Sequence, residues 1–319
     1  MNAPARIGVY AAGLAVVFGA SAAVAGAVVP EQTVTAWTQS TQSGVTEEGG
    51  MEHSQDGEAG TEPVRGLSAG QDGYLLSEVS APDAVGSSGE LSFRITDDEG
   101  APLTDYAASH EKELHLIVVR SDGTGFRHVH PQMDDDGVWS LPWTWDAAGT
   151  YRVYADFVPA DVSDGPDVTL SRTVQVAGDY EPAPATGTST TSSVDGFDVT
   201  LDGDLRAGAT SELTVNVTRD GEPVTTLQPY LGAFGHLVAL RDGDLAYLHV
   251  HPEGAEPTPG ALSGPAVTFM TQAPTPGRYL LYLDFQVDGH VHTATFAVNT
   301  TEGAGSAGAG DHGRDDHGH

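Results

Sequence analysis

The chain has 319 residues, which is enough for two or three ordinary domains, and its 45 acidic and 13 basic residues give a formal net charge of −32. A surface this acidic repels phosphate backbones, so we expect no nucleic-acid partner. The chain has no cysteine, which excludes disulfides, thiolate nucleophiles, zinc–thiolate sites, iron–sulfur clusters and blue copper, and leaves imidazole and carboxylate groups as metal ligands.

The first predicted element is an apolar segment over residues 1–29. Arg6 precedes an unbroken run of apolar and small residues, and alanines at positions 23, 25 and 27 provide signal-peptidase sites, a pattern typical of an export signal. The run is also long enough to cross a bilayer as a helix. As a cleaved signal peptide or as an uncleaved membrane anchor, the segment predicts that the remainder lies outside the cytoplasm, secreted or attached to the cell membrane.

Three further segments are predicted to be connections without a core of their own. Residues 30–65 are rich in Thr, Gln, Gly, Ser and Glu, which predicts a disordered tether. Residues 179–193 change from Pro and Ala to Thr and Ser, a composition typical of linkers. Residues 300–319 contain mainly Gly, Ala, Asp and His, which predicts a disordered tail whose histidines bind divalent metals loosely.

The two segments between these connections, residues 66–178 and 194–299, are copies of one another. Each has the usual length of a domain with one core. The best-matched stretches, first copy before second, are ELSFRI (90–95) and ELTVNV (212–217), HLIVVR (115–120) and HLVALR (236–241), and YRVYADF (151–157) and YLLYLDF (279–285).

The pattern within each copy predicts an all-β fold. Short runs rich in Val, Leu, Thr and Tyr alternate in polarity and are separated by Asp-Gly and Pro-Gly turn signals, and no stretch sustains a helical period. We therefore expect two tandem antiparallel β-sandwich domains, immunoglobulin-like or cupredoxin-like, after the N-terminal apolar helix. Such a fold does not by itself indicate a function.

Each copy carries three histidines, of which two form a His-Val-His motif and the third lies thirteen residues earlier. Side chains two residues apart on a strand share one face, so each motif directs two imidazoles to the same side of a sheet. A turn separates the motif from the third histidine, which predicts one hairpin carrying all three. The trios are His115, His128 and His130 in the first copy and His236, His249 and His251 in the second.

The turn residues predict which histidines lie opposite one another. The Asp-Gly pair at 122–123 predicts that His115 faces His130, and a two-residue Asp-Gly turn at 242–243 predicts that His236 faces His249. The two registers differ by two residues, so each keeps its trio on one face. Facing side chains lie about 4.5–5.5 Å apart, which is close enough for imidazoles to share a metal ion.

A carboxylate also interrupts the apolar closing strand of each copy, at Asp156 and Asp284. An inward carboxylate needs a partner, and it either ligates the metal or accepts the second N–H of a liganding histidine. The sequence therefore predicts a site of three histidines and one aspartate in each copy. Imidazole ligands suit Cu²⁺ and Zn²⁺, which are the expected ions.

Two alternatives stay open. The trios are also consistent with hydrogen-bonded clusters in a structural or protein-interaction module of immunoglobulin type, which is the second hypothesis. A metal-dependent enzyme is the third hypothesis, because three histidines with an open fourth position can activate water. Neither copy shows a general base beyond the aspartate, so we expect no enzyme. His110 precedes the first strand of the hairpin and is expected to be exposed.

Three segments resemble a group of exported proteins of high-GC bacteria, most of them uncharacterised or described as heavy-metal-binding: ELHLIVVR (113–120), GFRHVHP (125–131) and YLGAFGHL (230–237). The resemblance covers both copies and implies an extracytoplasmic, often membrane-anchored protein of metal handling, with copper as the usual ion. With the trios, it leads us to expect a non-catalytic protein that buffers or transfers Cu²⁺ or Zn²⁺, or confers resistance to them. A membrane metal transporter or another protein is the expected exchange partner.

Overall fold

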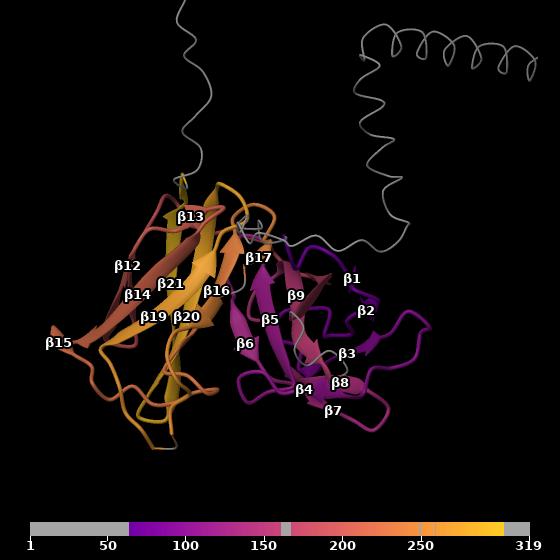
Figure 1. Ribbon diagram of the computed structural model, residues 1–319. Helices are drawn as coiled ribbons and strands as arrows, with labels where there is room; N and C mark the ends of the chain where they lie inside the picture. The colour runs from indigo at the N-terminus through magenta and orange to yellow at the C-terminus, as the bar shows by residue number, and fades with distance from the viewer. Residues whose placement is uncertain (1–63, 161–166, 249, 259, 303–319) are drawn as a thin grey trace, which may run out of the picture. The chain divides into compact units, whose positions relative to one another are not determined.

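The computed structural model describes residues 64–160, 167–248, 250–258 and 260–302, all within one unit of the chain, residues 59–319 (Figure 1). The apolar segment, the tether up to residue 63, the tail from residue 303 and His249 lie outside the described residues. Over the described ranges there is no α-helix. The same ranges contain no helix with the length and apolar character needed to cross a bilayer.

The first copy folds into two antiparallel sheets. One has the order β1 (Gly70–Gln71), β2 (Tyr74–Leu76), β3 (Gly89–Thr96), β8 (Val138–Trp143), β7 (Gln132–Met133). The other has the order β10 (Val168–Val176), β9 (Gly149–Pro159), β5 (Leu114–Arg120), β6 (Arg127–Val129), with β4 (Tyr106–Ala107) paired to β9.

The second copy repeats this arrangement. One sheet has the order β11 (Thr191–Val194), β12 (Phe197–Asp202), β14 (Thr210–Arg219), β19 (Ala266–Gln272), β18 (Val250–Pro252), with β15 (Glu222–Pro223) on β14. The other has the order β17 (Tyr247–Leu248), β16 (His236–Arg241), β20 (Arg278–Val287), β21 (His290–Asn299). A short parallel pair joins β13 (Arg206–Ala207) to β22 (Thr301–Glu302).

Buried and exposed residues alternate along the strands, and the buried ones form one core inside each sandwich. On β3, for example, Leu91, Phe93 and Ile95 are buried while the residues between them are more exposed. Large aromatic side chains lie in both cores, among them Trp139, Trp143, Trp145 and Phe157 in the first copy and Phe197, Phe269 and Phe285 in the second. The prediction of an all-β chain with two tandem antiparallel sandwiches is confirmed.

Strand β5 departs from this alternation, because all seven of its residues are buried. Its second face packs against the other copy in a third apolar cluster that contains side chains of both, among them Ile117, Val119, Val238 and Leu240. A strand covered on both faces reads as a continuous apolar run, as HLIVVR does. The sheets that carry the histidine hairpins therefore face one another across the two copies.

Hydroxyl groups reinforce this contact in a reciprocal way. The Tyr154 hydroxyl donates to the carbonyl of Leu245 at 2.5 Å, and the aligned Tyr282 hydroxyl donates to the carbonyl of Gly123 at 2.6 Å. Phe126 stacks on the ring of Tyr282 with centroids 4.1 Å apart. Each tyrosine thus reaches the hairpin turn of the opposite copy.

The registers of the two hairpins differ in how well the sequence predicted them. β5 and β6 pair Leu116 with Val129, which confirms the register that sets His115 opposite His130. In the second copy Ala239 pairs with Leu248, two residues away from the register that a two-residue turn predicts, so that prediction of the turn is wrong. His249, which it set opposite His236, lies outside the described residues. The physical reason lies in the turn, where Leu245 adopts a φ of 57° and is buried in the cluster between the copies. A two-residue turn leaves no residue for that burial.

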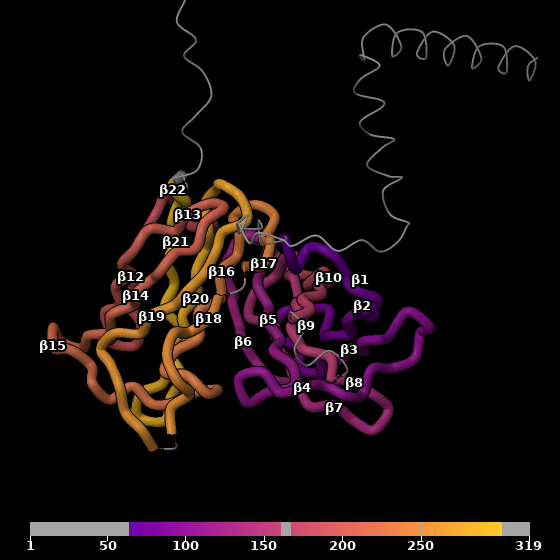
Figure 2. The backbone as a smooth tube through the Cα atoms, viewed as in Figure 1, coloured from indigo at the N-terminus to yellow at the C-terminus, as the bar shows by residue number. Residues whose placement is uncertain are grey.

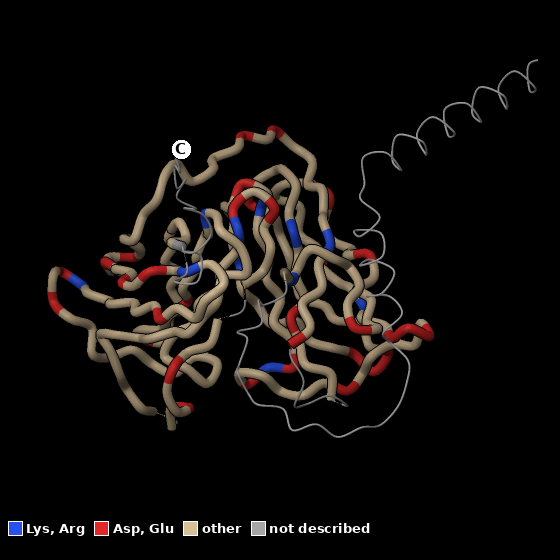
Figure 3. The backbone as a smooth tube through the Cα atoms, turned by 45° about the horizontal axis from the view of Figure 1, so that its top comes forward, with Lys and Arg blue, Asp and Glu red and all other residues tan. Residues whose placement is uncertain are grey.

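Acidic positions are spread over both copies, and few basic positions lie among them (Figure 3). Several arginines pair with neighbouring aspartates at the hairpin turns, including Arg120 with Asp122 at 2.7 Å and Arg278 with Asp242 at 2.6 Å. The large negative charge therefore belongs to the surface as a whole.

Candidate metal centre

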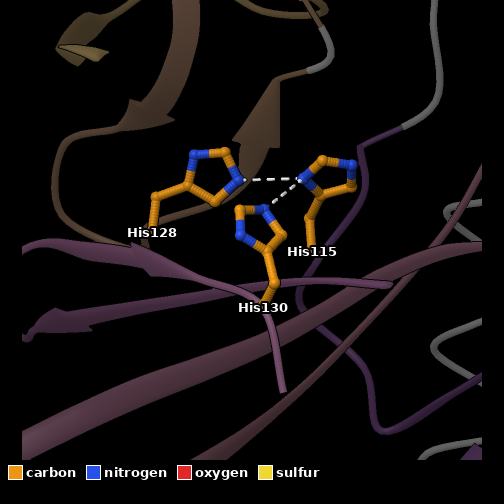
Figure 4. A group of neighbouring side chains, drawn as sticks. All are labelled: His115, His128 and His130. Carbon is orange, nitrogen blue, oxygen red and sulfur yellow. Dashed lines mark hydrogen bonds between the residues drawn. The ribbon is translucent and has the colours of Figure 1, made fainter. Parts of the chain in front are cut away.

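Three imidazoles of the first copy converge at the end of the hairpin. His115 lies on β5, His128 on β6 and His130 directly after β6. Their rings point toward one another (Figure 4). The Nδ1 atom of His115 lies 2.9 Å from Nε2 of His128 and 3.2 Å from Nε2 of His130.

In two of these rings the outer nitrogen, the one that faces away from the other rings, lies beside a group that can only accept a hydrogen bond. Nε2–H of His115 donates to the carbonyl of Ser109 at 3.0 Å. Nδ1–H of His128 donates to the carboxylate of Asp284 at 3.0 Å. Because each outer nitrogen keeps its hydrogen, the inner nitrogens, Nδ1 of His115 and Nε2 of His128, are the ones that a metal ion can bind.

The spacing of the rings fits one ion. Imidazoles bound to a tetrahedral metal at about 2.0–2.1 Å have nitrogens about 3.3 Å apart and ring centres about 5.2 Å apart. The ring centres of His115 and His128 are 5.2 Å apart, and His130 lies 5.0 Å from each. One ligand nitrogen from each ring lies within 4.8 Å of the other two. The spacing of the trio thus suits one metal ion after slight widening, with a fourth position left over.

The protonation states of His115 and His130 also suit a metal ion. Burial, reinforced by the neighbouring His128, lowers the pKa of His115 to about 2 and that of His130 to about 3. Both imidazoles are therefore neutral near pH 7, which is the form that binds metal ions.

Asp284 completes the surroundings of the trio from the other copy. It lies on β20, and its carboxylate accepts hydrogen bonds from His128 at 3.0 Å and from the Thr293 hydroxyl at 2.6 Å. The side chains of His128 and Asp284 are 3% and 4% exposed. The sequence predicted that this aspartate serves the histidines of its own copy; the structure pairs it with a histidine of the other.

Asp156 has a different environment, although its backbone is paired with His115 across the sheet. Its carboxylate accepts hydrogen bonds from the hydroxyls of Thr169 at 2.7 Å and Tyr247 at 3.3 Å, not from a histidine of the trio. Burial raises the pKa of Asp156 to about 7. The expectation that Asp156 serves the trio of its own copy is therefore not met by these hydrogen bonds.

The histidines of the second copy do not form a matching trio among the described residues. His236 is buried on β16, where its Nε2–H donates to the carbonyls of Tyr230 and Leu231 at 2.8 and 3.0 Å. His251 is exposed on β18, which pairs with β19 in the opposite sheet, as the tube in Figure 2 allows the reader to follow. His249 lies outside the described residues. The cluster found in the described part of the chain is the one in the first copy.

His110 is the residue that the sequence reasoning missed. It was expected to be exposed, but it is half-buried, and its ring centre lies 5.1 Å from that of His236 and 6.2 Å from that of His115. His110 and Glu111 have positive φ values of 48° and 63° in a tight turn closed by Ser109 and Lys112. Consecutive non-glycine residues in this region are uncommon and store strain. The sequence gives no turn signal of the Asn-Gly kind here, so the turn could not be anticipated.

A family model described as Domain of unknown function (DUF8832) matches the chain twice, over residues 69–178 and 192–302. The two matches correspond to the two sandwiches and together cover more than half of the chain. Among curated proteins, none matches this chain in sequence.

Several solved structures show weak similarity. A DUF4426 family protein from Pseudomonas aeruginosa shares 11% identity over 35% of this chain and 94% of its own, with a TM-score of 0.24. Salmonella alpha-2-macroglobulin shares 16% identity over 75% of this chain and 15% of its own, with a TM-score of 0.25. The Yersinia pseudotuberculosis adhesin InvE shares 13% identity over 70% of this chain and 57% of its own, with a TM-score of 0.21. This chain spans less than two thirds of the last two, and similarities at these TM-scores carry no argument about it.

Proposed function

We propose that this chain, which belongs to the DUF8832 family and carries its domain twice, binds one divalent transition metal ion at His115, His128 and His130. The observation that supports this most is the fixed orientation of two rings. The outer nitrogens of His115 and His128 donate to a carbonyl and a carboxylate, which directs the inner nitrogens at one point.

The ligand atoms limit which metal ions we expect at this site. Three imidazole nitrogens without thiolate suit Cu²⁺ and Zn²⁺, and the Irving–Williams order favours copper where both are present. The role proposed is non-catalytic: buffering or transfer of the ion outside the cytoplasm. The apolar segment at residues 7–29 and the resemblance to exported heavy-metal-binding proteins support that location.

A second candidate is a structural cluster without metal. The contacts of 2.9 and 3.2 Å between ring nitrogens are hydrogen-bond lengths, and an added proton on His128 or His130 would satisfy them. In that case the trio joins the hairpin to the other copy, through Asp284, as part of an interaction module.

A metal titration distinguishes the two candidates. The full chain is used, with the histidines outside the two copies changed to asparagine so that they do not mask the result: His53, His312, His317 and His319. Calorimetric titration with Cu²⁺ and Zn²⁺ is expected to show one tight equivalent per chain. That equivalent is lost when the trio is changed to asparagine and retained when His290 and His292 on β21 are changed instead. A chain that binds no tight equivalent leaves the structural cluster as the function of the trio.

A further inference from the structure

The trio leaves one coordination position unfilled, and further histidines lie beside it. A small cavity of about 40 Å³ is lined by four histidines, His110, His115, His128 and His236, and by two aspartates, Asp156 and Asp167. A volume of this size holds about one water molecule or an ion. The fourth side of the metal position therefore has histidines of both copies within reach.

His236 is the better placed of the two additional rings. Both its Nε2–H contacts are to backbone carbonyls, which fixes the hydrogen on Nε2 and leaves Nδ1 as the nitrogen available to a metal. The side chain is held on strand β16 and is buried at 7% exposure. His110, in contrast, lies in the turn between Ser109 and Lys112.

Asp284 ties His236 to the trio. It is paired with His236 across β16 and β20, and its carboxylate holds His128 of the other copy. Asp284 is therefore next to the backbone of His236 and in contact with the ring of His128. The ring centres of His128 and His236 are 6.2 Å apart, about 1 Å more than on a shared tetrahedral ion, and His236 is not among the histidines whose ligand nitrogens lie within 4.8 Å of one another. Ligation by His236 requires a side-chain movement, and such movements commonly accompany binding.

From these contacts we infer that His236 is the fourth ligand of the ion held by His115, His128 and His130, so that the metal links the two copies of the domain. The inference rests on the proposed function. It makes the site a closed one of four imidazoles, as in structural metal sites, instead of an open one with bound water. The ion then joins the histidine hairpin of the first copy to strand β16 of the second.

Cobalt spectroscopy on the full chain tests the inference. The chain has the same four outlying histidines changed to asparagine, and Co²⁺ is the probe because its visible spectrum reports exchangeable ligands. A metal-bound water ionises at around pH 7 to 9 and is displaced by azide, whereas four imidazoles leave neither response. The spectrum of the Co²⁺ chain is expected to be unchanged by azide and by pH across that range.

The variant His236→Ala is expected to gain both responses and to lose more than the roughly 10- to 100-fold in Co²⁺ affinity that loss of an outer-shell partner costs. His236→Gln, whose amide can still donate to the carbonyls of Tyr230 and Leu231, is expected to behave in the same way and controls for folding. His251→Ala, at the exposed histidine of the second copy, is expected to match the parent chain.

Three results overturn the inference. The parent chain responds to azide; or His236→Ala and His236→Gln both retain the parent spectrum; or the azide response arises in His110→Ala instead, which assigns the fourth ligand to His110. If the parent chain binds no Co²⁺, Cu²⁺ or Zn²⁺, the proposed function itself fails, and this outcome is distinct from the other three because no spectrum develops.

Discussion

The two copies of the domain contain the same histidine pattern, yet the described structure assembles it in only one of them. In both, a histidine, an aspartate and a threonine lie side by side across three strands: His115, Asp156 and Thr169 in the first, His236, Asp284 and Thr293 in the second. The difference arises in the second strand of the hairpin. A duplicated motif therefore does not imply a duplicated site.

The point at which the chain crosses between sheets accounts for the difference. In the first copy β6 stays paired with β5 to Val129, and the chain joins the other sheet only at β7, after His130. In the second copy β17 ends at Leu248 and β18 is already in the other sheet from Val250 onward. The crossing thus comes before His251, which is exposed on β18, whereas His236 is buried on β16.

The largest expected difference is in metal binding, between variants of the last histidine of each motif, His130 and His251. His130→Ala is expected to abolish tight Cu²⁺ or Zn²⁺ binding, because it removes one of three converging nitrogens, whereas the matched change His251→Ala leaves binding intact. Titration calorimetry on the chain without its outlying histidines measures both. Equal losses in the two variants would show that the second copy holds a site of its own.

The two aspartates should differ in how they respond to pH. The folded-state pKa of Asp156 is raised to about 7 from an ordinary value near 4, so its contribution to stability is present at low pH and is lost as the pH rises from about 4 to about 7. At about 1.4 kcal/mol per pKa unit, the loss is roughly 4 kcal/mol at most. In metal-free chain, Asp156→Asn removes this trend, so the unfolding free energy of the parent minus that of the variant, from urea titrations at several pH values, falls as the pH rises. A constant gap contradicts the prediction.

The same aspartates should affect metal binding unequally. Asp284→Asn weakens the acceptor that holds Nδ1–H of His128, and loss of such an outer-shell partner lowers metal affinity by about 10- to 100-fold. Asp156→Asn is the matched control and is expected to change affinity by less than about threefold, since its carboxylate contacts Thr169 and Tyr247. Competition titration with a chromophoric chelator resolves the two, and the reverse order would contradict the hydrogen bonds described.

The smallest difference is expected between Tyr154 and Tyr282, whose substitutions should reduce the unfolding free energy by similar amounts. Tyr154→Phe and Tyr282→Phe each remove one hydroxyl that donates to a carbonyl of the opposite copy, and each is expected to reduce the unfolding free energy by about 1 kcal/mol. Urea denaturation measures both. A loss of stability in one variant only would mean that the two hydrogen bonds, although similar in geometry, do not contribute equally to stability.

The sequence was sufficient for the features that depend on local pattern. Alternating apolar residues and Asp-Gly turns indicated the strands, internal repetition indicated the two sandwiches, and the turn at 122–123 indicated the register that brings His115 to His130. It was insufficient where the two copies meet. Nothing in the spacing of Asp284 shows that it faces His128 of the other copy, and nothing in the turn at 242–243 shows that Leu245 will be buried between them.

The exchange of tyrosine hydroxyls between hairpin turns has an evolutionary consequence. Contacts in which the same residue of each half reaches the other half are the mark of a twofold dimer. A dimer of identical subunits must change both of its sites whenever a mutation changes one. Once the halves are joined in one chain, each can diverge alone, so the first hairpin could keep its three imidazoles while the second gave up the pairing of His251 and retained Asp284 in support of its neighbour.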